Sequence, residues 1–339
     1  MLIAAAVATV IAVLVAAGLW GRASADAAAE EFSTEARAWQ DDELASMVNH
    51  GTVMPDGLFA DEKPWSAAAL KRQKTQCAAL DEAAEDLDTS IEAPELSPQV
   101  FGFLSGTYRD VSSATNHLQA DVTDLQTSVV ESVDQARLDC RFSLRHHQLL
   151  AKGQAALRRA EDHELAPGAS FTIGSTQIYC TAGDVVCIPP RERGLGDFVR
   201  EHRAYVATMK SVAKAASSPA CRATSLGKDS CAALAEEFRV QAAGHARWID
   251  VVDRSNGNDE AGWNRAAKRA DAAYEKAATA FGEAIVADHP ELEGMPYLTD
   301  PWPTEVFRDV MGGRTADLQE ELSEIKYDLS GRAARGDAV

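Results

Sequence analysis

Apolar residues recur at intervals of three and four along most of this chain, and that spacing is typical of amphipathic helices. The longer predicted helices span residues 27–48, 63–91, 97–163, 194–216, 230–253 and 260–286. A short C-terminal helix carries Leu318, Leu322, Ile325 and Leu329. Because short connections join the later helices, they are expected to be antiparallel neighbours in a helical bundle. The sequence therefore predicts a mainly α fold.

Two unusually long helices are predicted on either side of Pro94. Ser97 and Pro98 match the cap and the first residue of the second helix. Its apolar positions keep their spacing up to Leu157, with a shift of phase near Val133 that leaves a break there open. Together the two helices predict an extended helical hairpin or a coiled coil.

Residues 170–188 differ from the rest of the chain because their apolar positions alternate with a period of two, which predicts strands. Gly174-Ser175 fits a two-residue hairpin turn. A second turn after Cys180 would place Cys187 directly opposite it, within reach of a disulfide. We therefore expect a small three-stranded β-meander stapled by this pair.

Residues 2–20 form an uninterrupted apolar run of 19 residues without charge or proline. Crossing a bilayer as a helix takes about 20 residues. The run predicts a signal anchor that passes once through the cell membrane. The alternative is a signal peptide cleaved after Ala25, where small residues stand in the cleavage pattern, which would leave a secreted protein. Charges flanking the run do not define its orientation.

The chain is expected to divide in sequence order. The predicted parts are an anchor or signal peptide at 1–25, a long-helix region at 26–168, the meander at 169–190, a helical bundle at 191–290, and a Pro-rich stretch with the C-terminal helix at 291–339.

Six cysteines predict disulfides and an extracytoplasmic body, because an even count with two close pairs is typical of an oxidising compartment. Spacing pairs Cys180 with Cys187 and Cys221 with Cys231, which leaves Cys77 with Cys140. In a straight hairpin of two helices, however, Cys77 would face residues near 111. The last pairing thus needs another chain path, and the alternative is six buried thiols in a cytoplasmic body.

A net charge of −19 argues against nucleic acid as a ligand, because such a body repels phosphate backbones. His202 and His245 are the residues most suggestive of a site. Both lie in the apolar stripe of their helices, and an antiparallel hairpin would bring them to the same level. They predict a metal or pH-sensing pair, completed by a carboxylate such as Asp271. The alternative is two core histidines that hydrogen-bond each other or the backbone.

The adjacent His146 and His147 are expected to be solvated, because neighbouring residues on a helix point in different directions. No nucleophile elbow, phosphate-binding loop or H-E-x-x-H motif is present, so the sequence predicts neither an enzyme nor a cofactor.

The function predicted first is a membrane-anchored, extracytoplasmic scaffold or accessory protein of the cell envelope. Its expected partners are other envelope or membrane proteins and, through residues 2–20, the membrane itself; homo-oligomers are left open. A secreted ligand- or metal-binding protein is the second prediction, with its pocket near His202 and His245. An envelope hydrolase is the third.

Overall fold

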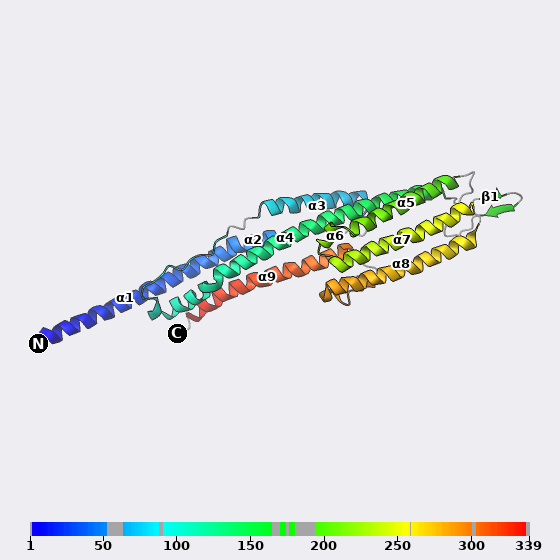
Figure 1. Ribbon diagram of the computed structural model, residues 1–339. Coiled ribbons are helices and arrows are strands. Elements are labelled where there is room, and N and C mark those ends of the chain that lie inside the picture. Colours follow the sequence, from blue (N-terminus) through cyan, green and yellow to red (C-terminus); the bar gives the residue numbers. More distant parts are fainter. Residues whose placement is uncertain are drawn as a thin grey trace. The chain divides into compact units, whose positions relative to one another are not determined.

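The computed structural model describes residues 2–52, 64–87, 91–164, 170–173, 176–179, 194–257, 259–299 and 303–336. Within these ranges, the side chains of 2–14, 50–52, 170–179, 297, 299, 304 and 328–336 are left aside. The described part is mainly helical (Figure 1).

The chain forms two compact units, each assembled from segments that are far apart in sequence. Unit 1 combines Met1–Met54, Leu80–Asp134 and Met311–Val339. Unit 2 combines Pro55–Ala79 and Gln135–Val310. The parts predicted from the sequence follow one another along the chain, whereas each unit combines segments from distant parts of it.

Unit 1 is built from long helices that lie side by side. Its elements are α1 (Leu2–Trp39), the π-helical turn η1 (Gln40–Leu44), α2 (Ala45–Thr52), the 3-10 turn η2 (Gly102–Leu104), the first part of α4 (Gly106–Glu161) and the later part of α9 (Pro303–Gly336). The predicted helix over 27–48 is thus part of a longer run, and the short C-terminal helix extends over 34 residues.

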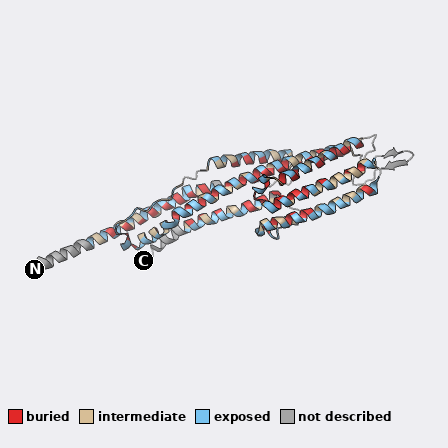
Figure 2. Cartoon of the chain, viewed as in Figure 1, coloured by how far each residue is buried: buried red, intermediate tan, exposed pale blue. Residues whose placement is uncertain are grey.

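The core of unit 1 takes one apolar stripe from each of these helices (Figure 2). Its larger buried members are Phe32, Trp39, Leu44, Met47, Val111, Leu118, Val122, Leu125, Val129, Leu318, Leu322 and Ile325. The predicted coiled coil is not found, because this core draws on four helices rather than on the single seam that a two-stranded coil would share.

The start of α4 differs from the prediction. Residues 91–99 have no regular secondary structure, so Ser97 and Pro98 do not begin a helix. Instead α4 begins at Gly106, and Ser105 is its cap, with the Ser105 hydroxyl accepting a 2.9 Å hydrogen bond from the backbone N–H of Tyr108. From there α4 continues for 56 residues without the break considered near Val133.

The non-helical segment 91–99 runs antiparallel along α4. The Gln126 amide donates to the carbonyl of Ile91 at 2.7 Å, and the Tyr108 hydroxyl donates to the carbonyl of Ser97 at 3.0 Å. An extended chain advances about 3.3 Å per residue and a helix about 1.5 Å, so roughly nine residues here span as much of α4 as roughly twenty helical residues do. The register of a straight helical hairpin, with Cys77 opposite residues near 111, is therefore not found, and Cys77 lies against Cys140 instead.

Unit 2 is a bundle of helices around the second part of α4. Its further elements are α3 (Ala67–Glu85, as far as Ala79), α5 (Leu195–Ala216), α6 (Pro219–Arg222), α7 (Lys228–Arg254), α8 (Glu260–Asp288), the 3-10 turns η4 (Pro290–Leu292) and η5 (Pro296–Thr299), and the beginning of α9. The predicted helices over 194–216, 230–253 and 260–286 are confirmed to within two residues at each end.

A β-hairpin also belongs to unit 2. Strand β1 (Ser170–Ile173) pairs antiparallel with β2 (Thr176–Tyr179), and Ile173 lies opposite Thr176, as a two-residue turn requires. The predicted three-stranded meander is not supported, since the described strands make a two-stranded sheet. Its predicted third strand and the pair Cys180 and Cys187 lie outside the described residues.

Within the described residues, no helix combines the length and the apolar composition that a membrane crossing requires. Most of the apolar run predicted to cross the membrane, residues 2–14, belongs to the part of α1 whose side chains are left aside.

Candidate functional site

His202 on α5 and His245 on α7 lie together inside unit 2. The two helices are antiparallel and are joined by a short loop that contains α6, which brings both side chains to the same level. The Nδ1 atom of His202 and the Nε2 atom of His245 are 2.7 Å apart, a hydrogen-bond distance. The spatial pairing predicted from the apolar stripes is therefore present.

Three aromatic side chains enclose this pair. Ring centroids lie 4.3 Å apart for Phe198 and His202, 4.8 Å for Tyr205 and His245, and 5.1 Å for Trp248 and His202. Such walls remove water without offering strong hydrogen-bond acceptors. The Nε2 atom of His202 is buried and has no hydrogen-bond partner among the described residues.

Burial keeps both imidazoles neutral at pH 7. It lowers the pKa of His202 to about 3, with a further contribution from the neighbouring His245, and lowers the pKa of His245 to about 4. The same surroundings raise the pKa of Tyr205 to about 12. A neutral imidazole carries one N–H, so one ring donates the shared hydrogen bond and the other accepts it.

Neutral imidazoles are suitable metal ligands, but a zinc site normally needs three or four protein ligands. The described residues contain no group of three or more His, Cys, Asp or Glu side chains placed to hold a metal ion. Asp271, expected as the third ligand, is exposed on α8. Metal binding by His202 and His245 stays a prediction, while the hydrogen-bonded core pair is what the geometry presents.

His146 and His147 on α4 form a second histidine cluster, and the expectation that they are solvated is wrong. Each is only 1% exposed. The Nδ1 atom of His147 lies 2.9 Å from the amide oxygen of Gln73, whose NH2 group donates to the Ser143 hydroxyl at 2.8 Å. Because that amide oxygen can only accept, His147 carries its proton on Nδ1.

His146 is packed as an aromatic ring rather than bound as a polar group. Its centroid lies 5.4 Å from that of Phe238 and 5.9 Å from that of Phe142. Neither ring nitrogen has a hydrogen-bond partner among the described residues. Burial lowers the pKa of His146 to about 4 and, together with the charge that His146 would carry, the pKa of His147 to about 3.

The burial of both histidines reflects the way in which α4 is covered within unit 2. Around Cys140 the buried positions of α4 come in adjacent pairs, one turn apart, rather than as single residues. The pairs are Asp139 with Cys140, Phe142 with Ser143, and His146 with His147. Such a pattern belongs to a helix that is covered on more than one side, whereas a helix at a surface buries one stripe.

Two disulfides hold unit 2 together, and both join the cysteines paired from the sequence. Cys77 on α3 is bonded to Cys140 on α4, with their Cα atoms 5.6 Å apart. This bond ties the two chain segments that make up the unit. No described cysteine is free.

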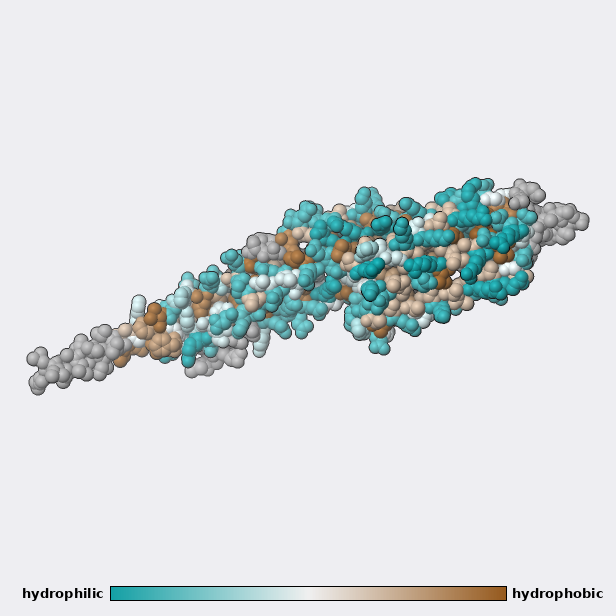
Figure 3. All heavy atoms as spheres, in the orientation of Figure 1, coloured by the Kyte–Doolittle hydropathy of each residue, from teal (hydrophilic) through white to brown (hydrophobic). Residues whose placement is uncertain are grey.

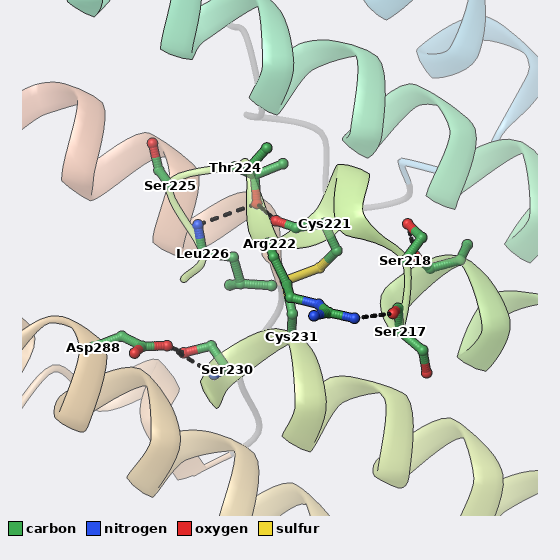
Figure 4. The surroundings of a disulfide bond; sticks show 12 residues. Ser217, Ser218, Cys221, Arg222, Thr224, Ser225, Leu226, Ser230, Cys231 and Asp288 are labelled. Atoms are coloured by element: carbon green, nitrogen blue, oxygen red, sulfur yellow. Dashed lines mark hydrogen bonds between the residues drawn. A yellow bond between two sulfur atoms is a disulfide. The ribbon is translucent and has the colours of Figure 1, made fainter. Parts of the chain in front are cut away.

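The second disulfide, Cys221–Cys231, closes the connection between α5 and α7 (Figure 4). The Thr224 hydroxyl donates to the carbonyl of Cys221 at 2.6 Å, and Asp288 accepts 2.8 Å hydrogen bonds from both the backbone N–H and the hydroxyl of Ser230. The loop that sets the register of His202 against His245 is thereby fixed at both ends.

A cavity of about 70 Å³ lies beside the histidine pair, with Tyr205 contributing to both. Its lining residues are Leu150, Gln154, Tyr205, Met209, Leu234, Glu237, Phe238, Gln241, Tyr274 and Pro303. The amide oxygen of Gln241 is buried without a hydrogen-bond partner among the described residues. Since one water needs about 10–15 Å³ by this measure, the space suits a few waters that could serve this oxygen.

Neither histidine cluster has the mutual arrangement of nucleophile, base and orienting acid by which a hydrolytic site is recognised. What the described residues show instead is a rigid, cross-linked bundle with neutral imidazoles inside it. Comparison with known protein families, with curated proteins and with solved structures finds no match for this chain.

Proposed function

We propose that this protein is a helical interaction component of the cell envelope, held at a membrane by its N-terminal residues 2–20, with its body on the extracytoplasmic side. The observation that carries the proposal is the pair of disulfides, Cys77–Cys140 and Cys221–Cys231. Disulfides persist in oxidising compartments and are rare in the cytosol, where thiols are kept reduced. The body therefore belongs outside the cytosol.

Retention of the N-terminal segment, rather than its cleavage, is supported by the packing of α1. Ala25, the last residue before the predicted cleavage point, is fully buried. On either side of it, Ser24 donates to the side-chain oxygen of Gln99 at 3.1 Å, and Asp26 accepts a hydrogen bond from the Ser105 hydroxyl. Cleavage after Ala25 would remove the turns of α1 that pack against residues 99–105. The apolar run is known from the sequence, and the anchor is inferred from it.

The buried polar side chains of unit 2 favour an interaction role over a catalytic one. Most of its buried polar groups are neutral imidazoles, amides and hydroxyls, and three carboxylates, Asp139, Glu201 and Glu237, are buried with them. Asp139 accepts a 2.7 Å hydrogen bond from the backbone N–H of Ser225, and Glu201 forms an ion pair with Arg159 at 2.8 Å. The long helical surfaces offer contact area to other proteins at a defined distance from a membrane. With a net charge of −19, we expect partners that present neutral or basic surfaces.

The compartment is tested by counting thiols in intact cells. Free thiols are alkylated before lysis, disulfides are then reduced, and the released thiols are alkylated with a second reagent of different mass. Cys77, Cys140, Cys221 and Cys231 should carry only the second label. Six thiols labelled in the first step would refute the extracytoplasmic placement.

The sidedness is tested with a single exposed position. Tyr327 on α9 is exposed, and Tyr327→Cys should react with a membrane-impermeant maleimide in intact cells while the protein sediments with membranes. The unsubstituted protein is the matched control for background labelling. Labelling of Tyr327→Cys only after the cells are permeabilised would contradict the proposal, and a mature N-terminus at Asp26 in the medium would identify a secreted protein instead.

A further inference from the structure

Most of the large apolar side chains that are exposed in the described residues come from two short stretches of unit 1. One is the α1 stretch 15–20, where Leu19 is 65% and Trp20 75% exposed. The other is the connection 100–104 before α4, where Val100 is 87% and Phe103 64% exposed. Figure 3 shows hydrophobic atoms gathered at the corresponding end of unit 1. We call these two stretches the apolar collar.

The two stretches pack against each other, and a hydrogen bond joins the residues next to them. A Cβ atom on Gly18 would lie 3.9 Å from Leu104, and one on Gly21 would overlap the ring of Phe101. Glycine at these positions therefore lets the connection lie directly against α1. Just beyond, the hydrogen bond between Ser105 and Asp26 closes the contact. The collar is thus one continuous surface, not two separate loops.

The chemistry of the collar changes abruptly at its edge. Residues 15–21 and 97–105 carry no charge, and the first charged residue after each stretch is an arginine, Arg22 and Arg109. Both are exposed. Arg22 follows Trp20 by two residues, and Arg109 follows Phe103 by six. Aromatic rings with arginine beyond them are typical of the place where a protein leaves a bilayer, because aromatic rings prefer the headgroup level and guanidinium groups reach the phosphates.

We propose that the apolar collar is a lipid-binding surface that sits in the interfacial layer of the membrane around the emerging α1 helix. This inference rests on the proposed anchor and adds a second, non-helical contact with the bilayer. The occupant is lipid because the collar is continuous with the apolar run. From Leu2 to Trp20 a helix rises about 28 Å, close to the 30 Å hydrocarbon thickness. An anchor of this length brings Trp20, and with it residues 100–104, to the membrane surface.

The collar has a structural consequence for the anchor. A lone helix can tilt and rotate in the bilayer, and its orientation is set by neighbours and by interfacial aromatic residues. Because Phe101 and Leu104 lie against Gly21 and Gly18, which share one face of α1, they add apolar and aromatic anchoring on that face. We therefore expect the collar to fix both the depth of α1 and the direction in which unit 1 leaves the membrane.

The test places a photoactivatable diazirine amino acid at single positions of the full-length protein, reconstituted in phosphatidylethanolamine–phosphatidylglycerol vesicles. A probe at position 103 reports the collar. A probe at position 327 is the matched control, because Tyr327 is also an exposed aromatic residue of unit 1 but lies outside the collar. A probe at position 10 reports the apolar run independently. The readout is the mass added to the probed peptide after illumination.

A gain of one lipid mass at positions 103 and 10, with only water added at 327, is the expected result. Lipid at position 10 but water at 103 overturns the collar and leaves the anchor standing. Water at both positions overturns the anchor as well. A peptide of a second copy joined at 103 identifies a dimer contact and likewise refutes the lipid assignment.

Discussion

The two units of this chain are stabilised in different ways. Unit 1 buries an almost wholly apolar core contributed by α1, α2, α4 and α9, with few buried polar side chains. Unit 2 contains the two disulfides found among the described residues and most of the buried polar residues there, including His146, His147 and His202. The difference predicts that reductant and acid act on unit 2, whereas loss of apolar contacts is the main way to weaken unit 1.

The largest effect is expected from removing the longer disulfide. Cys77→Ala with Cys140→Ala opens a 63-residue separation, for which loop-closure entropy gives about 4 kcal/mol of lost stability. The same estimate for Cys221→Ala with Cys231→Ala, which are 10 residues apart, is about 3 kcal/mol. Urea unfolding with hydrogen exchange on peptides of each unit measures both. Equal loss of protection in unit 1 would contradict the expectation that the disulfides stabilise unit 2 in particular.

Truncating a core side chain of unit 1 should instead weaken unit 1 and leave unit 2 largely unaffected. Leu125 is 1% exposed in unit 1, and Leu125→Ala is expected to cost about 3 kcal/mol through lost burial and the cavity left behind. Hydrogen exchange should rise in peptides of α1 and of the first part of α4. Leu138→Ala, at a half-exposed position of the same helix in unit 2, is the control and should change little.

Acid should weaken unit 2 selectively. The pKa of His146 is about 4 in the folded protein and 6.5 in an unstructured peptide, so the unfolded state binds its proton more tightly. Its contribution to stability is complete above pH 6.5 and falls by about 1.4 kcal/mol per pH unit between pH 6.5 and 4. His146→Leu should flatten this decline when unfolding is measured at pH 7, 5.5 and 4.5. An unchanged slope would show that His146 is not buried in its neutral form.

The smallest effect concerns the cap of α4. Ser105→Ala removes the acceptor for the Tyr108 N–H and the donor to Asp26, and should lower stability by about 1 kcal/mol. Faster amide exchange at Tyr108 would localise the loss to this helix end. Asp26→Ala separates the two contributions, since it leaves the cap bond intact. If both variants behave alike, the cap itself contributes nothing measurable.

Much of unit 2 could be predicted from sequence because its later helices alternate regularly with short loops. The same periodicity brought His202 and His245 to one level, and the local spacing of Cys221 and Cys231 indicated their disulfide. These features depend on contacts between neighbouring helices. Short-range patterns of apolar residues specify such contacts well.

Other features could not be predicted because they depend on the whole assembly. Ser97 and Pro98 match a helix start, yet residues 91–99 are held extended by side chains of α4 far along the chain. The burial of His146 and His147 similarly requires that α4 be covered from several sides. A single sequence does not reveal how many neighbours a helix has, and tertiary contacts override local preference.

The order in which the chain is made adds a constraint that follows from the interleaving of the units. Leu318, Leu322 and Ile325 complete the core that begins with Phe32 and Trp39. During synthesis, the N-terminal helices therefore expose an apolar face until α9 has emerged, and exposed apolar surface favours aggregation during that period. A chain truncated before α9 would therefore lack a complete unit 1, even though the N-terminal helices of that unit are made first.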